Sequence, residues 1–245
     1  MGVYAERPWL HLYGEGQPHD ITPEYPDALS MFAASVARNP DGDAIRYFDG
    51  RITYRELDEL TDAFAVALLD GGLQRGDRVA MYLQNVPQFI IGLVGTWKAG
   101  GIAVSVNPMN RERELALLLP DSGSKVLVCL QGLYRDVAAS VVGDTDVTSV
   151  ITTSELDFQT RDDPRAFPGS ERATPDGTTD LLELIGRFRG RQPPPVDYGP
   201  DDIAFLTYTS GTTGPPKGAM NTHGNVVFNS QAYREWCGLD RKSVV

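Results

Sequence analysis

Hydrophobic positions along the first 150 residues follow two different periods. Segments whose apolar residues stand three or four apart predict helices, whereas short runs that are apolar throughout predict strands buried on both faces. The predicted helices span 27–38, 54–70, 87–100 and 111–119, and the predicted strands span 78–83, 102–106 and 125–130. One more helix and strand fit 131–152. Because such strands alternate with helices, the pattern predicts an α/β fold with a parallel sheet covered on both faces.

Turn and capping residues mark several boundaries of these elements. Asn39-Pro40 stops the first helix, and Thr53 with Glu56 fits a capping box at the start of the second. Asp49-Gly50 lies between two short strand-like segments and predicts a hairpin with a tight turn. The local signals therefore agree with the hydrophobic periods on where the elements begin and end.

The alternation of predicted helices and strands stops at residues 153–180. These residues are polar, charged and rich in Gly and Pro, so we expect a long surface loop. A short helix is predicted over 181–188, and three consecutive prolines at 193–195 then indicate a semi-rigid spacer. We therefore expect two subdomains, in which residues 1–190 form a first α/β subdomain and residues 191–245 begin a second one.

The most informative loop follows an apolar strand predicted over 203–209. Five Ser and Thr hydroxyls and three glycines lie within residues 207–218, and Lys217 stands near the end. Glycines let successive backbone N–H groups converge on an anion, hydroxyls add donors without bulk, and a lysine adds a mobile charge. The spacing from Gly211 to Lys217 matches the start of a P-loop, but Pro216 replaces its second glycine. The segment therefore predicts a phosphate-binding loop of another kind.

Composition narrows the expected partners and compartment. The chain of 245 residues has 22 Lys and Arg against 33 Asp and Glu, a formal net charge of −11. Such a surface repels nucleic acid and anionic membranes, so small molecules are the expected partners. The two cysteines are far apart and fit neither a disulfide framework nor a zinc site. We find no secretory signal and no apolar stretch long enough to span a bilayer, and we expect a cytoplasmic protein.

The segment LTYTSGTTGPPKG at 206–218 resembles the signature of the adenylate-forming, or AMP-binding, superfamily. Residues 52–68 and 97–108 resemble the first and second conserved blocks of that family, and the resemblance spans about residues 26 to 235. The sequence after residue 108 looks more like a fatty acyl-CoA synthetase than like an adenylation domain of a peptide synthetase. The resemblance implies the N-terminal part of the acetyl-CoA-synthetase-like fold.

The resemblance also implies a reaction in two steps. ATP and a carboxylic acid form an acyl-adenylate and pyrophosphate, and the thiol of coenzyme A then displaces AMP; Mg²⁺ is expected with the nucleotide. The residues implied to hold the β- and γ-phosphates are Thr209, Ser210, Gly211, Thr212, Thr213, Gly214 and Lys217. His223 is implied to lie near the nucleotide, and the alternative is a structural role at the start of a helix over 223–236 that Thr222 caps. No catalytic residue or metal ligand is assigned within the chain.

Later elements of the family have no counterpart in these 245 residues. They include the acid-binding pocket and the small C-terminal domain with its catalytic lysine. We therefore expect a truncated, inactive fragment of an acid–thiol ligase that acts on a fatty acid. Two alternatives stay open. One is a naturally short, non-catalytic protein that binds a nucleotide or a partner, and the other is an adenylating enzyme for an aromatic acid or an amino acid.

Overall fold

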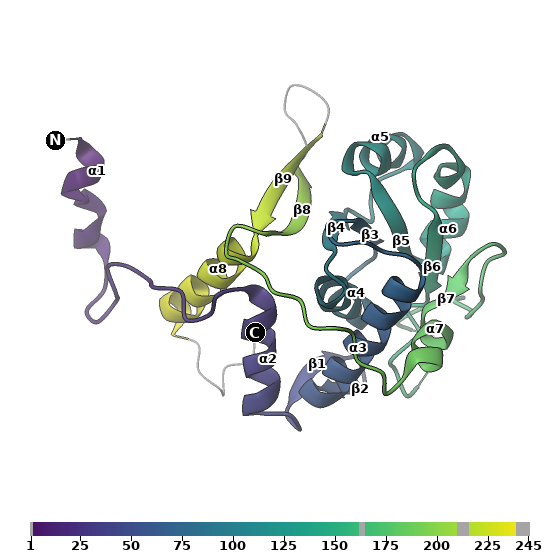
Figure 1. Ribbon diagram of the computed structural model, residues 1–245, viewed down its shortest axis with the longest axis horizontal. Coiled ribbons are helices and arrows are strands. Elements are labelled where there is room, and N and C mark those ends of the chain that lie inside the picture. Colours follow the sequence, from purple (N-terminus) through teal and green to yellow (C-terminus); the bar gives the residue numbers. More distant parts are fainter. Residues whose placement is uncertain (1, 162–164, 210–215, 239–245) are drawn as a thin grey trace.

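A computed structural model describes residues 2–161, 165–209 and 216–238 (Figure 1). Its centre is one sheet of seven strands in the order β7-β6-β5-β3-β4-β8-β9. The strands are β3 (Arg78–Tyr82), β4 (Ile102–Val106), β5 (Ser124–Leu130), β6 (Ser149–Thr153), β7 (Thr179–Asp180), β8 (Ile203–Thr209) and β9 (Lys217–Thr222). Neighbouring strands are parallel except for β8 and β9, which are antiparallel. This sheet confirms the predicted α/β fold.

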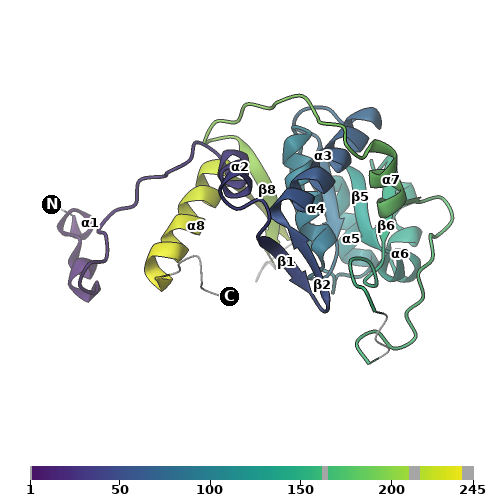
Figure 2. The same cartoon turned by 90° about the horizontal axis from the view of Figure 1, so that it is seen from below.

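Helices cover both faces of the sheet (Figures 1 and 2). One face carries α3 (Tyr54–Asp70), α4 (Pro87–Lys98) and α7 (Leu181–Phe188), and the other carries α5 (Glu112–Ser122) and α6 (Gln131–Asp136). Alternate side chains of β3 enter the two resulting cores: Val79 and Met81 lie in the first, and Ala80 and Tyr82 lie in the second. Burial on both faces is the reason why these strands are apolar throughout.

The remaining elements lie around this sheet. They are α1 (Val3–Glu6), the 3₁₀ helices Pro8–Leu12, Ala138–Ser140 and Val142–Asp144, α2 (Ala28–Arg38), the antiparallel hairpin of β1 (Asp43–Tyr47) and β2 (Gly50–Thr53), and α8 (His223–Cys237). The predicted hairpin and the predicted helix over 27–38 are confirmed. Figure 1 shows α1 beyond α8, away from the sheet. Helices of four or five residues have too few positions to show a hydrophobic period, so the sequence did not predict those before residue 13.

Side-chain caps begin the helices where the sequence predicts them. Thr53 Oγ1 accepts a hydrogen bond from the backbone N–H of Glu56 at 3.2 Å, and Glu56 Oε2 accepts one from the backbone N–H of Thr53 at 2.8 Å. These bonds satisfy N–H groups that have no partner within the helix. The helix α5 runs three residues past its predicted end at 119. It includes Pro120 in its last turn, and Gly123 then ends it with a left-handed φ of 59°.

Most of the predicted loop over 153–180 is irregular where the structure describes it, but its first residue ends β6 and its last two, Thr179 and Asp180, form β7, which pairs with β6. Polar contacts hold the loop against the sheet. Arg172 donates to Asp157 at 2.8 Å and to Asp180 at 2.8 Å. Asp157 also accepts a hydrogen bond from the hydroxyl of Thr153, at the end of β6, at 2.8 Å. The buried carboxylates therefore tie the loop to the ends of β6 and β7.

β8 and β9 follow the predicted subdomain boundary and extend the same sheet beside β4. Trp97 on α4 donates from Nε1 to the carbonyl of Ala204 in β8 at 2.8 Å, and the hydroxyl of Tyr198 donates to the carbonyl of Trp97 at 2.8 Å. These contacts hold β8, and the segment that leads into it, against α4. The division into residues 1–190 and 191–245 stays a prediction.

A partly buried cluster of charges joins α3 to α4. Lys98 Nζ lies 2.6 Å from Asp58 Oδ1 and 2.5 Å from Asp62 Oδ1, and the Lys98 side chain is 10% exposed. The two helices also approach closely at Gly95, where a Cβ atom would lie 2.6 Å from Cδ1 of Phe64. A charge at this depth needs its partners, because removal from water penalises an unpaired ion.

Candidate functional site

The hairpin of β8 and β9 brings the two ends of the predicted phosphate loop together. Thr209, the last residue of β8, is the cross-strand partner of Lys217, the first residue of β9. The remaining predicted phosphate contacts are Ser210, Gly211, Thr212, Thr213 and Gly214, and they lie outside the described residues. The structure therefore places both flanks of the loop, whereas its contacts with phosphate stay a prediction.

The loop leaves the sheet at the edge where ligands bind in this class of fold. β8 is parallel to β4, with Ser105 opposite Thr207, so the carboxyl ends of both strands lie at one edge. In open α/β sheets, ligands occupy the space outside the carboxyl ends of the strands. The position of the loop thus fits an anion site, and it follows from the parallel pairing of two strands that are about 100 residues apart.

Lys217 is the positive charge that the hairpin presents at this edge. Its side chain is exposed, as is that of Thr209 beside it. Within the described ranges of the chain, Lys217 forms no ion pair with a carboxylate. Its ammonium group is therefore available for an anion, in contrast to Lys98, which two carboxylates occupy.

Tyr208 connects the hairpin to α5. Its hydroxyl donates to Asp121 Oδ2 on α5 at 2.6 Å, and its ring lies against Gly218, where a Cβ atom would be 3.2 Å from Cζ. Burial, followed by the hydrogen bond with Asp121, raises the pKa of the Tyr208 phenol. The sequence did not predict the contact with Asp121, because 87 residues separate the two side chains and no spacing rule connects them.

His223 lies inside the protein at the start of α8. Its side chain is 0% exposed and stacks on the ring of Tyr198 at 4.0 Å between centroids, with Trp97 on α4 at 5.4 Å. Neither ring nitrogen has a hydrogen-bond partner among the described residues. The side chain of Thr222 accepts a hydrogen bond from the backbone N–H of Asn225 at 3.1 Å, which confirms the predicted cap. The position near the nucleotide implied for His223 stays a prediction.

Replacing His223 by phenylalanine is expected to flatten the loss of stability in acid. Burial lowers the pKa of His223, although the carboxylates of Asp27 and Asp202 oppose the shift. As the pH falls below the ordinary histidine pKa of about 6.5, the unfolded chain therefore binds a proton that the folded chain does not, and stability is lost. Between about pH 7 and about pH 5, the melting temperature of His223→Phe should fall less than that of the unmodified protein.

The exposed His19 provides the matched control for this experiment. The variant His19→Phe should keep the acid profile of the unmodified protein. Equal profiles for His223→Phe and the unmodified protein would show that other groups take up the proton.

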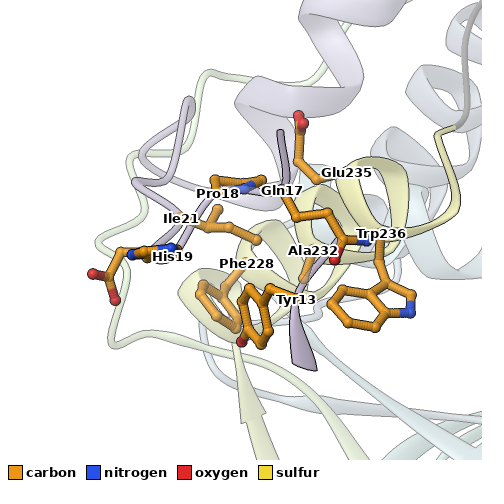
Figure 3. Close-up of a pocket in the computed structure, with 10 residues that line it drawn as sticks. Tyr13, Gln17, Pro18, His19, Ile21, Phe228, Ala232, Glu235 and Trp236 are labelled. Atoms are coloured by element: carbon orange, nitrogen blue, oxygen red, sulfur yellow. The ribbon is translucent and has the colours of Figure 1, made fainter. Parts of the chain in front are cut away.

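A cavity of about 310 Å³ lies between the N-terminal segment and α8 (Figure 3). Tyr13 and Ile21 line it from one side, and Phe228 and Trp236 line it from α8. The rings of Tyr13 and Trp236 meet edge to face at 5.5 Å, and Trp236 is still 59% exposed. The carboxylates of Asp20 and Glu235 also line this cavity, and no Lys or Arg is among its described lining residues, so it is a poor match for phosphate.

Across the described ranges, no three His, Cys, Asp or Glu side chains lie together in a way that could hold a metal ion. No helix in these ranges is both long and apolar enough to cross a membrane.

The chain is similar in sequence to a known family of enzymes. The family model described as "AMP-binding enzyme" matches residues 32–245. A long-chain-fatty-acid–CoA ligase of Escherichia coli O6:H1 is 36% identical over 234 residues, which cover 90% of this chain and 41% of that protein. A protein with the same name from Bacillus subtilis is 33% identical over 246 residues, covering 96% of this chain and 43% of the relative. The chain thus spans about two-fifths of the length of these relatives.

The solved structures show the same fold. The crystal structure of a long-chain-fatty-acid–CoA ligase from Archaeoglobus fulgidus superimposes with a TM-score of 0.73 at 24% identity, covering 94% of this chain and 43% of that one. An identity this low supports the fold alone. The family match covers most of the chain and includes the hairpin that carries Thr209 and Lys217. On this evidence, the chain belongs to the family of AMP-binding enzymes.

Proposed function

We propose that the chain is the phosphate-binding, N-terminal part of an ATP-dependent acid–thiol ligase. The ligase activates a fatty acid as an acyl-adenylate and transfers the acyl group to coenzyme A. The observation that carries this proposal is the exposed Lys217, which forms no ion pair with any described residue and lies beside Thr209 at the carboxyl edge of the sheet. The long-chain-fatty-acid–CoA ligases among the relatives support the choice of acid and thiol. We place the reaction in the cytoplasm, where its small-molecule substrates are available.

The proposed chemistry begins with a carboxylate oxygen that attacks the α-phosphorus of ATP. The bond from this phosphorus to the pyrophosphate oxygen breaks, and pyrophosphate leaves with additional negative charge. Preorganised donors stabilise charge that develops in the transition state more than they stabilise the ground state. In this step, the backbone N–H groups and hydroxyls of residues 209–214 hold the β- and γ-phosphates, and the ammonium group of Lys217 follows the departing charge. The thiol of coenzyme A then attacks the acyl carbon and releases AMP.

Mg²⁺ is proposed as part of the bound nucleotide. The ion neutralises charge on the phosphate oxygens, and it commonly keeps several water ligands. The described residues lack a cluster of acidic or histidine ligands, so we assign no protein ligand to the ion.

The function can be tested in a chimera that continues this chain with the remaining C-terminal part of the Bacillus subtilis relative. We expect exchange of labelled pyrophosphate into ATP that depends on a long-chain fatty acid. Exchange with benzoate or with an amino acid, and none with a fatty acid, would identify an adenylating enzyme for another acid.

The chain by itself should bind MgATP in a calorimetric titration, and Lys217→Ala should weaken this binding. MgATP binding by the chain with no exchange by the chimera would favour the non-catalytic alternative. A chain that does not bind MgATP, together with a chimera that exchanges no pyrophosphate with any acid, would contradict the phosphate-binding role.

A further inference from the structure

The strand order creates a crevice at the carboxyl ends of β3 and β5. The chain leaves β3 through α4 toward β4 on one side, and it leaves β5 through α6 toward β6 on the other. The helices α4 and α6 lie on opposite faces of the sheet, so two adjacent strands continue into diverging connections. In open α/β sheets, this reversal opens a crevice where ligands bind. β4 separates the crevice from β8 and the phosphate loop.

A cavity of about 480 Å³ lies at this crevice. Residues 84–86, which follow β3, form one wall, and part of α6 forms another. Two aromatic residues from other segments also line the cavity: Phe48, from the β1–β2 hairpin, and Phe167, from the loop after β6. The volume is within the range of about 300–1,000 Å³ that is typical of sites for small molecules.

Phe48 has a backbone conformation that a large side chain disfavours. Its φ of 51° lies in the left-handed region, which is rare for bulky residues. Gly50, two residues further along the same hairpin, cannot be replaced by a larger residue, because a Cβ atom at position 50 would lie 1.9 Å from the carbonyl oxygen of Phe158. The Phe48 side chain is 62% exposed, and its ring meets Tyr47 at 4.8 Å and Phe167 at 5.0 Å, both edge to face. Strain of this kind is concentrated at ligand sites.

The charges around the cavity are negative. Asp136 and Glu155 line it, and no Lys, Arg or His is present among its described lining residues. Glu155 accepts a hydrogen bond from the hydroxyl of Ser170 at 2.8 Å, whereas Asp136 is exposed and has no partner in the described part of the chain. Burial and then the carboxylates of Glu155 and Asp157 raise the pKa of Tyr47 to about 12. A cation is therefore favoured in the cavity over an anion.

We propose that this cavity binds an organic cation with an apolar body, such as an alkyl- or arylammonium ion. The rings of Phe48 and Phe167 contact the apolar body and attract the ammonium group through their negative faces. Asp136 supplies the opposite charge. ATP, pyrophosphate, coenzyme A and carboxylic acids are all anionic, so this site is separate from the substrates of the proposed ligase and goes beyond that function.

The proposal can be tested by calorimetric titration of the chain with benzyltrimethylammonium. We expect saturable binding. Benzyl alcohol and benzoate carry the same ring without the positive charge, and they should bind at least about tenfold more weakly.

Two variants separate the proposed contacts from the stability of the fold. Phe48→Gly should weaken binding about fivefold without lowering the melting temperature, because glycine adopts a positive φ without strain. Asp136→Asn should weaken binding about fivefold through the lost charge. Phe228→Ala on α8 and Asp144→Asn, both outside the cavity, are the matched controls and should bind as the unmodified protein does.

Lys217→Ala should also leave binding of the ammonium ion unchanged, so the test does not depend on the phosphate loop. The proposal is overturned if the chain shows no saturable binding of benzyltrimethylammonium. It is also overturned if benzoate binds as tightly, or if neither Phe48→Gly nor Asp136→Asn weakens binding.

Discussion

Replacing Lys217 by alanine is expected to slow pyrophosphate exchange about 100-fold in the chimera that contains this chain. The expected size comes from enzymes in which one preorganised donor to a developing negative charge was removed. Lys217 is exposed, forms no ion pair in the described part of the chain and lies at the flank of the loop beside Thr209. Its removal should therefore affect the transition state without disturbing the core.

The measurement is the rate of exchange at saturating fatty acid, together with the melting temperature of each variant. Lys125→Ala is the matched control, because Lys125 forms only a partly exposed contact with Asp146 at 3.7 Å, away from the hairpin. We expect the control to keep its rate and both variants to keep their melting temperature. Unchanged exchange in Lys217→Ala would show that the lysine does not stabilise the leaving pyrophosphate.

Replacing Lys98 by methionine is expected to lower the free energy of unfolding by about 3–5 kcal/mol at neutral pH. The methionine fills a similar volume, but it leaves the carboxylates of Asp58 and Asp62 without the ammonium group that lies 2.6 Å and 2.5 Å from them. Asp62 is the more deeply buried of the two, with a side chain that is 14% exposed. An unpaired carboxylate at this position is costly because water cannot replace the lost partner.

The loss should depend on pH. Burial raises the pKa of Asp62 even though Lys98 opposes the shift, so removing Lys98 raises this pKa further. Between the pKa of Asp62 in the unfolded chain and its higher pKa in the folded one, the folded state binds more protons, and stability decreases as the pH rises. The destabilisation of Lys98→Met should therefore be larger at neutral pH than at about pH 4.

Urea unfolding at the two pH values measures this effect. The double variant Lys98→Met with Asp62→Leu should recover most of the lost stability, because it removes the charge that was left unpaired. Arg55→Met is the control, since it breaks the exposed contact with Asp41, whose expected contribution is below about 1 kcal/mol. A similar loss in Arg55→Met and Lys98→Met would contradict the importance of burial.

Local signals in the sequence were sufficient for most of the elements. Thr53 and Glu56 form their predicted capping box, because both partners lie within one helical turn. The turn at Asp49-Gly50 shows the limit of such signals. The predicted hairpin forms, but its two turn residues are Phe48 and Asp49 rather than Asp49 and Gly50. Phe48 takes the left-handed φ, and Gly50, the first residue of β2, is needed for the close approach of the strand to Phe158. That approach depends on a loop more than 100 residues away, which the turn sequence cannot reveal.

The candidate binding sites show the same contrast between local sequence signals and contacts that join distant segments. The sequence by itself determined the α/β class and the family resemblance, and it predicted a phosphate loop from Thr209 to Lys217, because each depends on residues that are close together in the chain. Only the tertiary structure decided that Tyr208 contacts Asp121, that His223 lies between Tyr198 and Trp97, and that aromatic rings and carboxylates surround the cavity at the ends of β3 and β5. The physical reason is that these contacts come from strand order and helix packing, which join distant segments that carry no shared local pattern.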